Sequence, residues 1–546
     1  MRGIGHPANV RSPPVGAVSA GSERAASPDY AEVVTPAPTA PRDRAVLAIR
    51  RHSSWLLPAA LAVLAGLLRI VGLGHPHELV FDETYYVKDA WTLLNLGYEG
   101  QWGDGANEAF LAGDPGVYTT EGSFVVHPPL GKWIIALGLA VFGADTGWGW
   151  RMGTAVVGTL LVPLLTLVAK RVSGSMAVAG VAGLLLAIDP LAVALSRVSL
   201  LDGILAFFVL LGFWFLAIDG PAARDRILRA GPATWGPVIW SRPWLVAAGV
   251  SFGAASAVKW SGLYVLAGAG LGLVAMDALW RRRAGVREWY VSAIARQAPA
   301  TFLLLVPAAA VVYLVSWTGW LRTTGGYDRL SAENPLAALW NYHEAIYGFH
   351  VQLSASHPYA SPAWQWPLLL RPTAMWVSRP EVGSTTCGWS DDCMAEISSI
   401  PNPVVWYAGF AAALYLLWLV IRTRRARYAF PLAGLAVTYL PWLLYPERTV
   451  FQFYTVTMLP FVILSLALAL QHLTRVRESV LLPDPTELEI AFAADAARRA
   501  RGRWRAVVAV FLVVAIAVAL FYLPLALGIP EPYGLWRLHS WMPSWV

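Results

Sequence analysis

The chain has little charge and little cysteine. Charged residues make up 14% of its 546 positions, against roughly 25% in soluble globular proteins. Its two cysteines have no histidine near them and do not supply the four ligands that zinc prefers. The sequence also lacks a P-loop and the GxSxG, HExxH and paired CxxC patterns. Nucleotide hydrolysis, serine hydrolysis and zinc-peptidase chemistry therefore have no residues to support them.

Apolar residues are abundant instead. They reach 57% of the sequence and gather in uncharged runs such as 55–66 and 506–520. Each run belongs to a stretch near the ~20 residues that cross a bilayer. The 27 tryptophans agree, because indole rings favour the headgroup boundary. The sequence predicts an all-α polytopic membrane protein.

Hydropathy predicts about eleven transmembrane helices. The expected spans are 53–73, 148–170, 175–190, 200–218, 243–258, 260–279, 297–317, 403–421, 429–445, 454–472 and 506–524.

Five regions follow from these spans. Residues 1–52, rich in Pro, Ala, Ser and Arg, should be a disordered cytoplasmic tail. An N-terminal catalytic membrane region, a second long polar loop, a C-terminal four-helix region and a final tail should follow. Their expected bounds are 53–317 (with a first outer loop at 74–147), 318–402, 403–524 and 525–546.

Basic residues set the expected orientation. The loops at 170–174, 219–242, 280–296, 422–428 and 473–505 all carry Lys or Arg, which is typical of cytoplasmic loops. They share one side only if the short apolar stretch 130–143 lies along the membrane surface. Both long polar segments and the C-terminus then face outward. The same clusters account for the net charge of +7 without nucleic acid.

Cys387 and Cys393 fall in the second outer segment, six positions apart. Thiols this close can oxidise outside the cytoplasm, so a disulfide is expected. Two free thiols are the alternative.

Asp82 and Glu83 follow the first span directly. Paired carboxylates at a membrane edge can act as a general base or as metal ligands. They can equally begin a helix over 83–94, with Asp82 as its N-cap and Glu83 in its first turn. The two interpretations are compatible.

His127 and Lys132 flank Pro-Pro-Leu-Gly at the start of the surface helix. The prolines pre-form a first helical turn, where an anion is favoured. The alternative is a lysine that reaches the headgroups and a histidine that faces water.

Single cations lie on the outer side, where topology disfavours them. They are Arg69, Arg151, Lys259 and, from the second loop, Arg371. Each alone can pair with an Asp or Glu, but four of them beside one acidic pair indicate a phosphate site.

An aromatic and proline-rich run occupies the second outer segment. It contains His357, Tyr359, Trp364 and Gln365. Such a run can form an interfacial belt or offer apolar faces and polar partners to a sugar.

Together these residues resemble the protein O-mannosyltransferases, a family of GT-C membrane glycosyltransferases. The resemblance covers about 55–525. It rests on Phe81-Asp82-Glu83, the His-Pro-Pro-Leu-Gly-Lys motif at 127–132, Trp150-Arg151, Val258-Lys259-Trp260 and His357-Pro358-Tyr359 through Arg371.

The resemblance implies a polyprenyl-phosphate mannose donor, a Ser or Thr acceptor on a secreted protein, and inversion at the anomeric carbon. It gives Asp82 the role of catalytic base, with Glu83 beside it. It assigns donor phosphate to Arg151 and Lys259 and, more weakly, Arg371, with His127 and Lys132 as further candidates at the same site. Arg69, His357, Tyr359, Trp364 and Gln365 are expected to support the site.

No cofactor or resident metal is expected from the resemblance, and dependence on a divalent ion stays open. The expected partners are the bilayer, the lipid-linked donor, secreted acceptors and, where acceptors emerge, the secretion translocon. The segment 318–402 is too short for the β-trefoil domain of eukaryotic members, so the chain resembles the bacterial type. A related enzyme with a lipid or glycan acceptor, and a transporter, are the alternatives.

Overall fold

The computed structural model describes residues 41–384, 387–389, 392–474 and 487–545. The chain divides into two units, 1–52 and 53–546. The tail expected to be disordered as far as residue 52 is helical from Pro41, where α1 begins. The predicted tail lies outside the described residues as far as residue 40.

Every predicted span coincides with helix. The helices are α1 (Pro41–Ile70), α5 (Gly147–Ser173), α6 (Met176–Ile188), α7 (Pro190–Arg197), α8 (Leu201–Ala230), α9 (Pro243–Val258), α10 (Ser261–Arg283), α11 (Trp289–Val291), η1 (Ser292–Gln297), α12 (Ala298–Ser316), α15 (Pro403–Thr423), α16 (Ala426–Tyr439), η3 (Leu440–Leu444), η4 (Gln452–Thr457), α17 (Leu459–Thr474) and α18 (Glu487–Leu527). Among the described residues, six helical stretches are long and apolar enough to cross a membrane, or seven if the bent pair α6–α7 is one span. The multi-pass membrane class is confirmed, and the number of crossings stays a prediction.

The bend between α6 and α7 has a local cause. Asp189 caps α7 by accepting a hydrogen bond from the Ala192 amide at 3.2 Å, and Pro190 cannot continue α6. The buried Arg69 of α1 donates to the carbonyls of Leu186 and Ala187, which the break leaves open. Arg69 thus supports a kink between spans.

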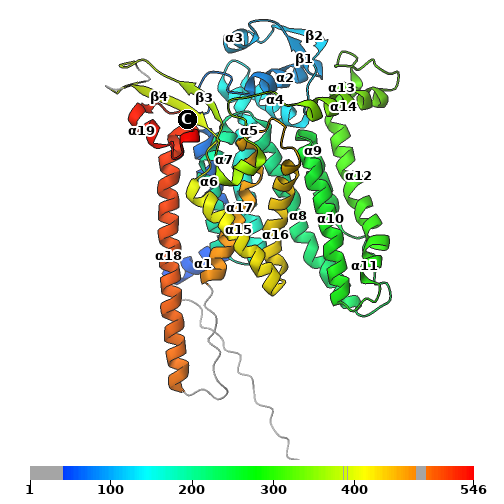
Figure 1. The fold of residues 1–546 in the computed structure, drawn as a ribbon, viewed down its shortest axis with the longest axis vertical. Helices are drawn as coiled ribbons and strands as arrows, with labels where there is room; N and C mark the ends of the chain where they lie inside the picture. Colours follow the sequence, from blue (N-terminus) through cyan, green and yellow to red (C-terminus); the bar gives the residue numbers. More distant parts are fainter. Residues whose placement is uncertain (1–40, 385–386, 390–391, 475–486, 546) are drawn as a thin grey trace, which may run out of the picture. The chain divides into compact units, whose positions relative to one another are not determined.

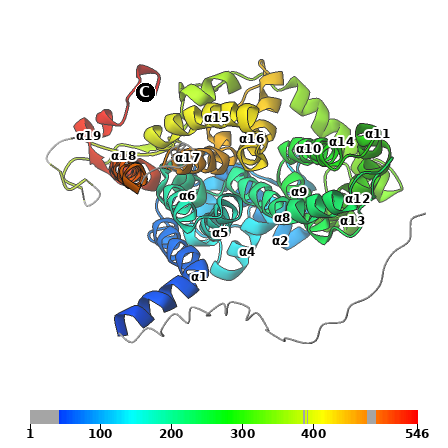
Figure 2. The same cartoon turned by 90° about the horizontal axis from the view of Figure 1, so that it is seen from below.

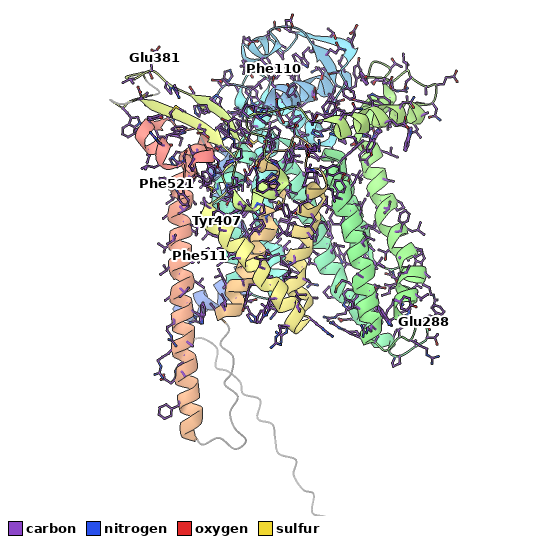
Figure 3. All side chains as sticks on the ribbon, viewed as in Figure 1. Phe110, Glu288, Glu381, Tyr407, Phe511 and Phe521 are labelled. Atoms are coloured by element: carbon purple, nitrogen blue, oxygen red, sulfur yellow. A yellow bond between two sulfur atoms is a disulfide. The ribbon has the colours of Figure 1, made fainter. Side chains whose placement is uncertain are left out.

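The two long polar segments form a layer at one end of the spans (Figure 1). Its elements are α2 (Glu83–Leu96), β1 (Gly100–Trp102), α3 (Ala106–Leu111), β2 (Tyr118–Gly122), α4 (Leu130–Phe142), α13 (Thr318–Arg322), α14 (Pro335–Gln352), η2 (Ala363–Leu368), β3 (Ala374–Ser378) and β4 (Cys393–Ser398), joined by β5 (Glu531–Pro532), α19 (Tyr533–Leu538) and η5 (Pro543–Trp545). In Figure 3, Phe110 and Glu381 lie at this end, and Glu288, within the basic 280–296 loop, lies at the other. This arrangement agrees with the predicted separation of long polar segments from basic loops.

Two small antiparallel sheets, which the sequence did not predict, stiffen the layer. In the first, Trp102 of β1 pairs with Tyr118 of β2. In the second, ordered β3-β4-β5, Val377 pairs with Glu396 and Met394 with Glu531. A disulfide joins Cys387, in the loop before β4, to Cys393, the first residue of β4. The pairing of β4 with β5 holds the C-terminal tail against the second outer segment.

Helix α4 occupies almost the whole stretch predicted to lie on the surface. It begins at Leu130, directly after Pro128 and Pro129, and packs against α2 and α5. Gly138 permits the close approach to α5, because a Cβ there would overlap the carbonyl oxygen of Gly149. In Figure 2, which views the chain from below, α4 lies next to α5, in agreement with their contacts. The helix therefore joins the outer layer to the spans that carry the candidate site.

Candidate active site

Asp82 stands at the N-cap position of α2 without capping it. Its carboxylate makes no bond to the amides of the first helical turn. It accepts only a long hydrogen bond from the Tyr86 hydroxyl, at 3.4 Å. Asp82 therefore occupies the N-cap position, as the capping interpretation predicts, but makes no capping hydrogen bond. Its carboxylate oxygens can still accept hydrogen bonds from a ligand.

The backbone before Asp82 is held in an uncommon conformation. Phe81 has a φ of 52°, in the left-handed region that costs a non-glycine residue about 1–3 kcal/mol. Its ring makes edge contacts with His357, Phe451 and Phe453 at 5.7–6.0 Å between centroids. The second outer segment and the C-terminal region thus hold the turn that presents Asp82.

Glu83 and Arg151 form a fully buried, saturated pair. Arg151 Nε and Nη2 donate to the two carboxylate oxygens at 2.9 and 2.8 Å. The Ser199 and Val80 amides donate to the same carboxylate at 2.7 and 2.8 Å.

The remaining N–H groups of Arg151 are also used. They donate to the backbone carbonyls of Leu73, Pro76 and Glu78 at 2.8–3.3 Å. Since a guanidinium has five donors, none remains for a ligand in this arrangement. The geometry does not support the expected phosphate contact of Arg151 and favours a structural role.

Lys132 is likewise neutralised inside the protein. Its ammonium contacts Glu99 and lies 3.6 Å from Asp89, with the lysine side chain 1% exposed. This cluster fastens α4 to α2 and to the strand that follows α2. Lys132 therefore favours the structural interpretation over the phosphate one.

Lys259 is different, because one carboxylate and one ring are its main partners. Its ammonium lies 2.9 and 3.1 Å from the oxygens of Asp202, in the first turn of α8, and 4.3 Å from the ring centre of Tyr454. Lys259 itself occupies an extended position between α9 and α10. The break between these helices brings its charge to the layer that holds Asp82.

Burial raises the pKa of Asp82 to about 6, while the nearby charge of Lys259 opposes this rise and that of Asp202 adds to it. A carboxyl group with this pKa is ionised at neutral pH and accepts a proton more readily than an exposed aspartate. Its properties are those of a general base.

Next to Asp82 lies a group of rings and one more cation. The ring centre of His127 lies 6.0 Å from that of Tyr86, and the His127 ring stacks on His350 with 5.7 Å between the ring centres. Arg448 Nη2 lies 3.0 Å from His350 Nδ1. Burial lowers the pKa of His127 well below its usual value, and burial with the charge of Arg448 lowers that of His350 to about 4. Both imidazoles are therefore neutral at pH 7.

Two polar atoms of this group are buried without a hydrogen-bond partner among the described residues. They are Nδ1 of His127 and Nε of Arg448. Because unsatisfied buried groups are costly, these atoms indicate where a polar ligand would be bound.

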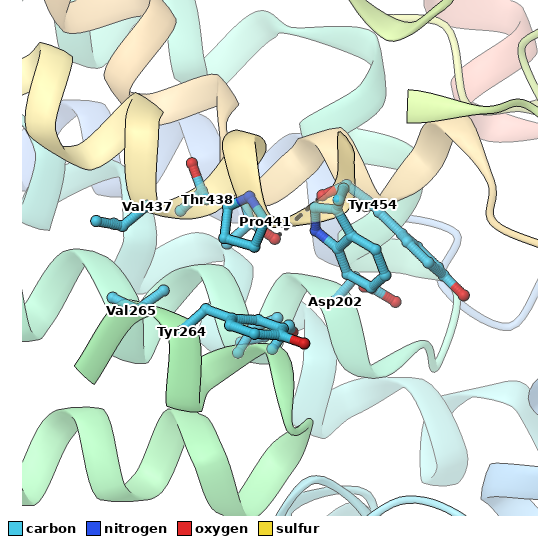
Figure 4. Close-up of a pocket in the computed structure, with 11 residues that line it drawn as sticks. Asp202, Tyr264, Val265, Val437, Thr438, Pro441 and Tyr454 are labelled. Atoms are coloured by element: carbon cyan, nitrogen blue, oxygen red, sulfur yellow. Dashed lines mark hydrogen bonds between the residues drawn. The ribbon is translucent and has the colours of Figure 1, made fainter. Parts of the chain in front are cut away.

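A pocket opens beside Asp202 and Tyr454 (Figure 4). It lies between α8, α10, the α16–η3 segment and η4. Its other walls include the apolar side chains of Val265, Val437 and Pro441. Polar side chains such as Ser261 and Thr438 line it as well, so the narrow pocket has mixed walls and adjoins the Asp202–Lys259 pair.

Three other predicted residues contact the periphery of the site. His357 contacts Phe81, as described. Arg371 lies over the Tyr359 ring at 5.3 Å and donates to the carbonyls of Pro358 and Ser544. These contacts link the second outer segment to the C-terminal tail. A phosphate role for Arg371 has no support from them.

Two residues of the same run and Arg69 are also outside the ring group around Asp82. Trp364 is 57% exposed. Gln365 accepts a hydrogen bond from the Ser361 hydroxyl at 3.3 Å. Arg69 lies at the α6–α7 bend, where Ser196 is a further partner at 3.2 Å. Their expected supporting roles have no direct contact with Asp82 behind them and stay predictions.

Sequence reasoning missed several site residues. They are Tyr86, Asp202, His350, Arg448 and Tyr454. A signal for Arg448 was present, because it lies three positions after the outer end of the predicted span 429–445. Asp202 and Tyr454 had none, since a single acid or phenol at a helix end is common. Within the described ranges no group of three or more His, Cys, Asp or Glu side chains is placed to hold a metal ion.

Two family models match the chain. The model for dolichyl-phosphate-mannose-protein mannosyltransferase matches residues 59–320, and that for the C-terminal four-transmembrane region of protein O-mannosyltransferase matches 335–545. The first match includes Asp82, His127 and Lys259, and the second includes His350, Arg448 and Tyr454.

Curated relatives and a solved structure agree. Polyprenol-phosphate-mannose–protein mannosyltransferase of Mycolicibacterium smegmatis (strain MKD8) is 31% identical over 94% of this chain and 96% of its own length. The enzyme of that name from Mycobacterium tuberculosis (strain CDC 1551) is 30% identical over 91% and 92%. The structure of the Saccharomyces cerevisiae Pmt1-Pmt2 complex bound to the sugar donor has a TM-score of 0.66 at 16% identity, covering 92% of this chain and 94% of that one. The fold is the GT-C glycosyltransferase fold, and the chain belongs to the protein O-mannosyltransferase family.

Proposed function

We propose that the enzyme transfers mannose from polyprenyl-phosphate mannose to Ser or Thr hydroxyls of secreted proteins. The donor and the protein acceptor come from the names of its relatives. The observation that carries the chemistry is Asp82, a carboxylate with one long hydrogen bond and a pKa raised to about 6 beside Lys259.

In this mechanism Asp82 removes the proton of the acceptor hydroxyl as its oxygen attacks the anomeric carbon. The bond between that carbon and the phosphate oxygen breaks, and the electron pair leaves with the lipid phosphate. One displacement of this kind inverts the anomeric carbon. A positioned base contributes typically about 10²–10⁴-fold to the rate.

Lys259 and Arg448 are the cations we assign to the leaving phosphate. Both belong to the group around Asp82 and His127, and Arg448 Nε has no hydrogen-bond partner in the part of the chain that the structure describes. Positive groups aimed at developing charge stabilise the transition state more than the ground state. Asp202 is then the residue that positions Lys259.

The narrow pocket beside Asp202 marks the side from which we expect the lipid end of the donor to approach. Apolar side chains such as Val265 and Val437 line it next to polar ones, and Asp202 links it to Lys259, the cation that would meet the phosphate. This placement favours a donor delivered from within the membrane.

The proposal includes a location. We infer a plasma-membrane protein with a cytoplasmic N-terminus and an extracytoplasmic C-terminus and site. Support comes from basic loops at the end of the spans opposite the two long segments. The translocon is the natural neighbour of an enzyme acting on emerging chains.

The test is transfer by purified protein from polyprenyl-phosphate mannose, with a Ser/Thr peptide and a lipid acceptor offered in parallel. We expect mannosylated peptide, its loss in Asp82→Asn, and normal yield in Asp114→Asn, an exposed residue of the same outer segment. Product on the lipid alone would assign the enzyme to the related class with lipid acceptors.

A further inference from the structure

Helix α14 carries an exposed apolar stripe on one face. Leu336, Trp340, Tyr347 and Val351 are 57%, 67%, 63% and 61% exposed. Their spacing of four, seven and four residues places them on one side of an α-helix. Four large apolar side chains in a row are more than the scattered exposure normal for a protein surface.

The opposite face of α14 already has its partners. Leu339, Tyr342 and Ile346 are buried in a cluster with Trp317 and Trp320. The Tyr342 hydroxyl also bonds both backbone groups of Val125 at 2.9 Å. The buried face fixes α14 against the outer layer, and the described residues leave the stripe on its other face uncovered.

The surroundings of the stripe indicate lipid. In Figure 1, α14 runs across the end of α12, a stretch long and apolar enough to cross the membrane. The last turns of α12 expose Val311, Leu314 and Val315 at 60%, 42% and 63%. Helix α14 thus lies at the level where an exposed, apolar span ends.

Residue chemistry agrees with this position. Trp and Tyr favour the headgroup boundary. An amphipathic helix buries its apolar face about 5–10 Å into that boundary when it lies in the membrane plane. Glu344 lies at the edge of the stripe, where its carboxylate accepts a hydrogen bond from the Trp340 indole at 2.9 Å, an arrangement suited to the boundary between headgroups and water.

We propose that α14 is an in-plane membrane helix whose stripe of Leu336, Trp340, Tyr347 and Val351 is immersed in the leaflet on the side of the two long polar segments. The second long segment is thus anchored in the membrane by a helix of its own, besides the spans that flank it.

This anchoring also reaches the site, a point that rests on the function proposed above. His350 belongs to α14, contacts Arg448 and stacks on His127. The depth of α14 in the leaflet therefore sets the height of the cation that we assign to the lipid phosphate.

Depth can be measured without any activity. Nitroxide labels on Trp340→Cys and Tyr347→Cys, in the full chain in nanodiscs, are compared with a label on Ala345→Cys, an exposed position on another side of α14. We expect the first two labels to be relaxed by oxygen and protected from a water-soluble nickel complex, and the third to show the reverse. Nickel access at all three would overturn the proposal, and so would labels immobilised by a second copy.

A functional arm separates this inference from the proposed function. Trp340→Glu with Tyr347→Glu should lower transfer from a long-chain donor by roughly tenfold to hundredfold, the loss that a misplacement of about 1 Å can cause. Transfer from a short, water-soluble prenyl donor should be kept, and Ala345→Glu should leave both rates unchanged. Equal loss with both donors would contradict the coupling, whereas failure of the wild-type protein with either donor would count against the proposed function instead.

Discussion

Asp82 and Glu83 are neighbours in the chain but belong to two different environments. Glu83 is completely buried, and both its oxygens are used by Arg151 and two backbone amides. Asp82 is half-buried and has one long hydrogen bond. Their cations differ in the same way, since Arg151 has no free donor while Lys259 has one carboxylate and one aromatic face.

The difference separates structure from chemistry. A buried ion pair is stable only when further hydrogen bonds satisfy it, and a pair satisfied to this extent has no capacity left for a substrate. An incompletely bonded carboxylate near a cation has that capacity. Saturation of hydrogen bonds, more than charge or burial, therefore distinguishes the two acids of the Asp-Glu pair.

The largest effect is expected at Asp82. Asp82→Asn keeps the shape but removes the proton acceptor, so turnover should fall about 10²–10⁴-fold while thermal unfolding in detergent is unchanged. Steady-state transfer and a melting curve on the same preparation check both parts. A variant that unfolds early would mean that Asp82 resembles Glu83 after all.

Arg151→Ala should show the opposite pattern. It leaves the Glu83 carboxylate buried without its cation, a change that typically costs about 3–5 kcal/mol. Yield and melting temperature should drop, while turnover per folded molecule is affected much less than in Asp82→Asn. Arg224→Ala, in an exposed ion pair with Asp225, is the matched control and should cost about 0–1 kcal/mol. If Arg151→Ala were stable but used the lipid donor poorly, Arg151 would have to be assigned to the phosphate site.

The group around Asp82 is tested by Arg448→Met and by Lys259→Met combined with Asp202→Asn, so that no buried carboxylate is left without its cation. Losing a hydrogen bond to a charged group costs about 1.5–3 kcal/mol, which corresponds to a roughly tenfold to hundredfold weaker use of the donor. Titration with polyprenyl-phosphate mannose at fixed peptide should show this, with the peptide dependence unchanged. Unaltered donor dependence in both variants would leave the phosphate without an assigned cation.

The pH profile sharpens the same comparison. Because the pKa of Asp82 is raised to about 6 from 3.8, turnover should fall about tenfold per unit as pH drops below 6. The sign for stability is opposite, since a buried acid with a raised pKa is stabilised when it is protonated. The contribution of Asp82 to stability therefore increases as pH falls from about 6 to 4, and transfer rates with parallel melting curves test the contrast.

The smallest effect on activity is expected at the disulfide. Its loop spans six positions, and loop-closure entropy gives such a bond about 2 kcal/mol of stabilisation. Cys387→Ser with Cys393→Ser should lower the melting temperature and leave turnover near wild type. Peptide mapping without reductant that finds both wild-type cysteines alkylated would contradict the bond itself.

Apolar runs in the sequence were sufficient to predict the helices and the two long outer segments. The sequence also indicated Asp82 and Lys259 as candidates, through charges at span ends, and their roles stay proposals. It could not separate Arg151 from Lys259, because both are single cations at outer ends of spans. Their roles depend on which carbonyls and carboxylates surround them, and those come from residues 50 to 80 positions away, such as Leu73 and Asp202. The short strands were missed because two to six residues carry no clear periodicity.

The strained Phe81 has a consequence for synthesis of the enzyme. Its conformation is maintained by Phe451 and Phe453, more than 360 residues later in the chain. Asp82 is made early, but its position is fixed only after the late spans have been inserted. A nascent N-terminal half should therefore be catalytically silent, and activity should appear when a separately expressed C-terminal half is supplied. The enzyme therefore becomes active only after its own synthesis and membrane insertion are complete.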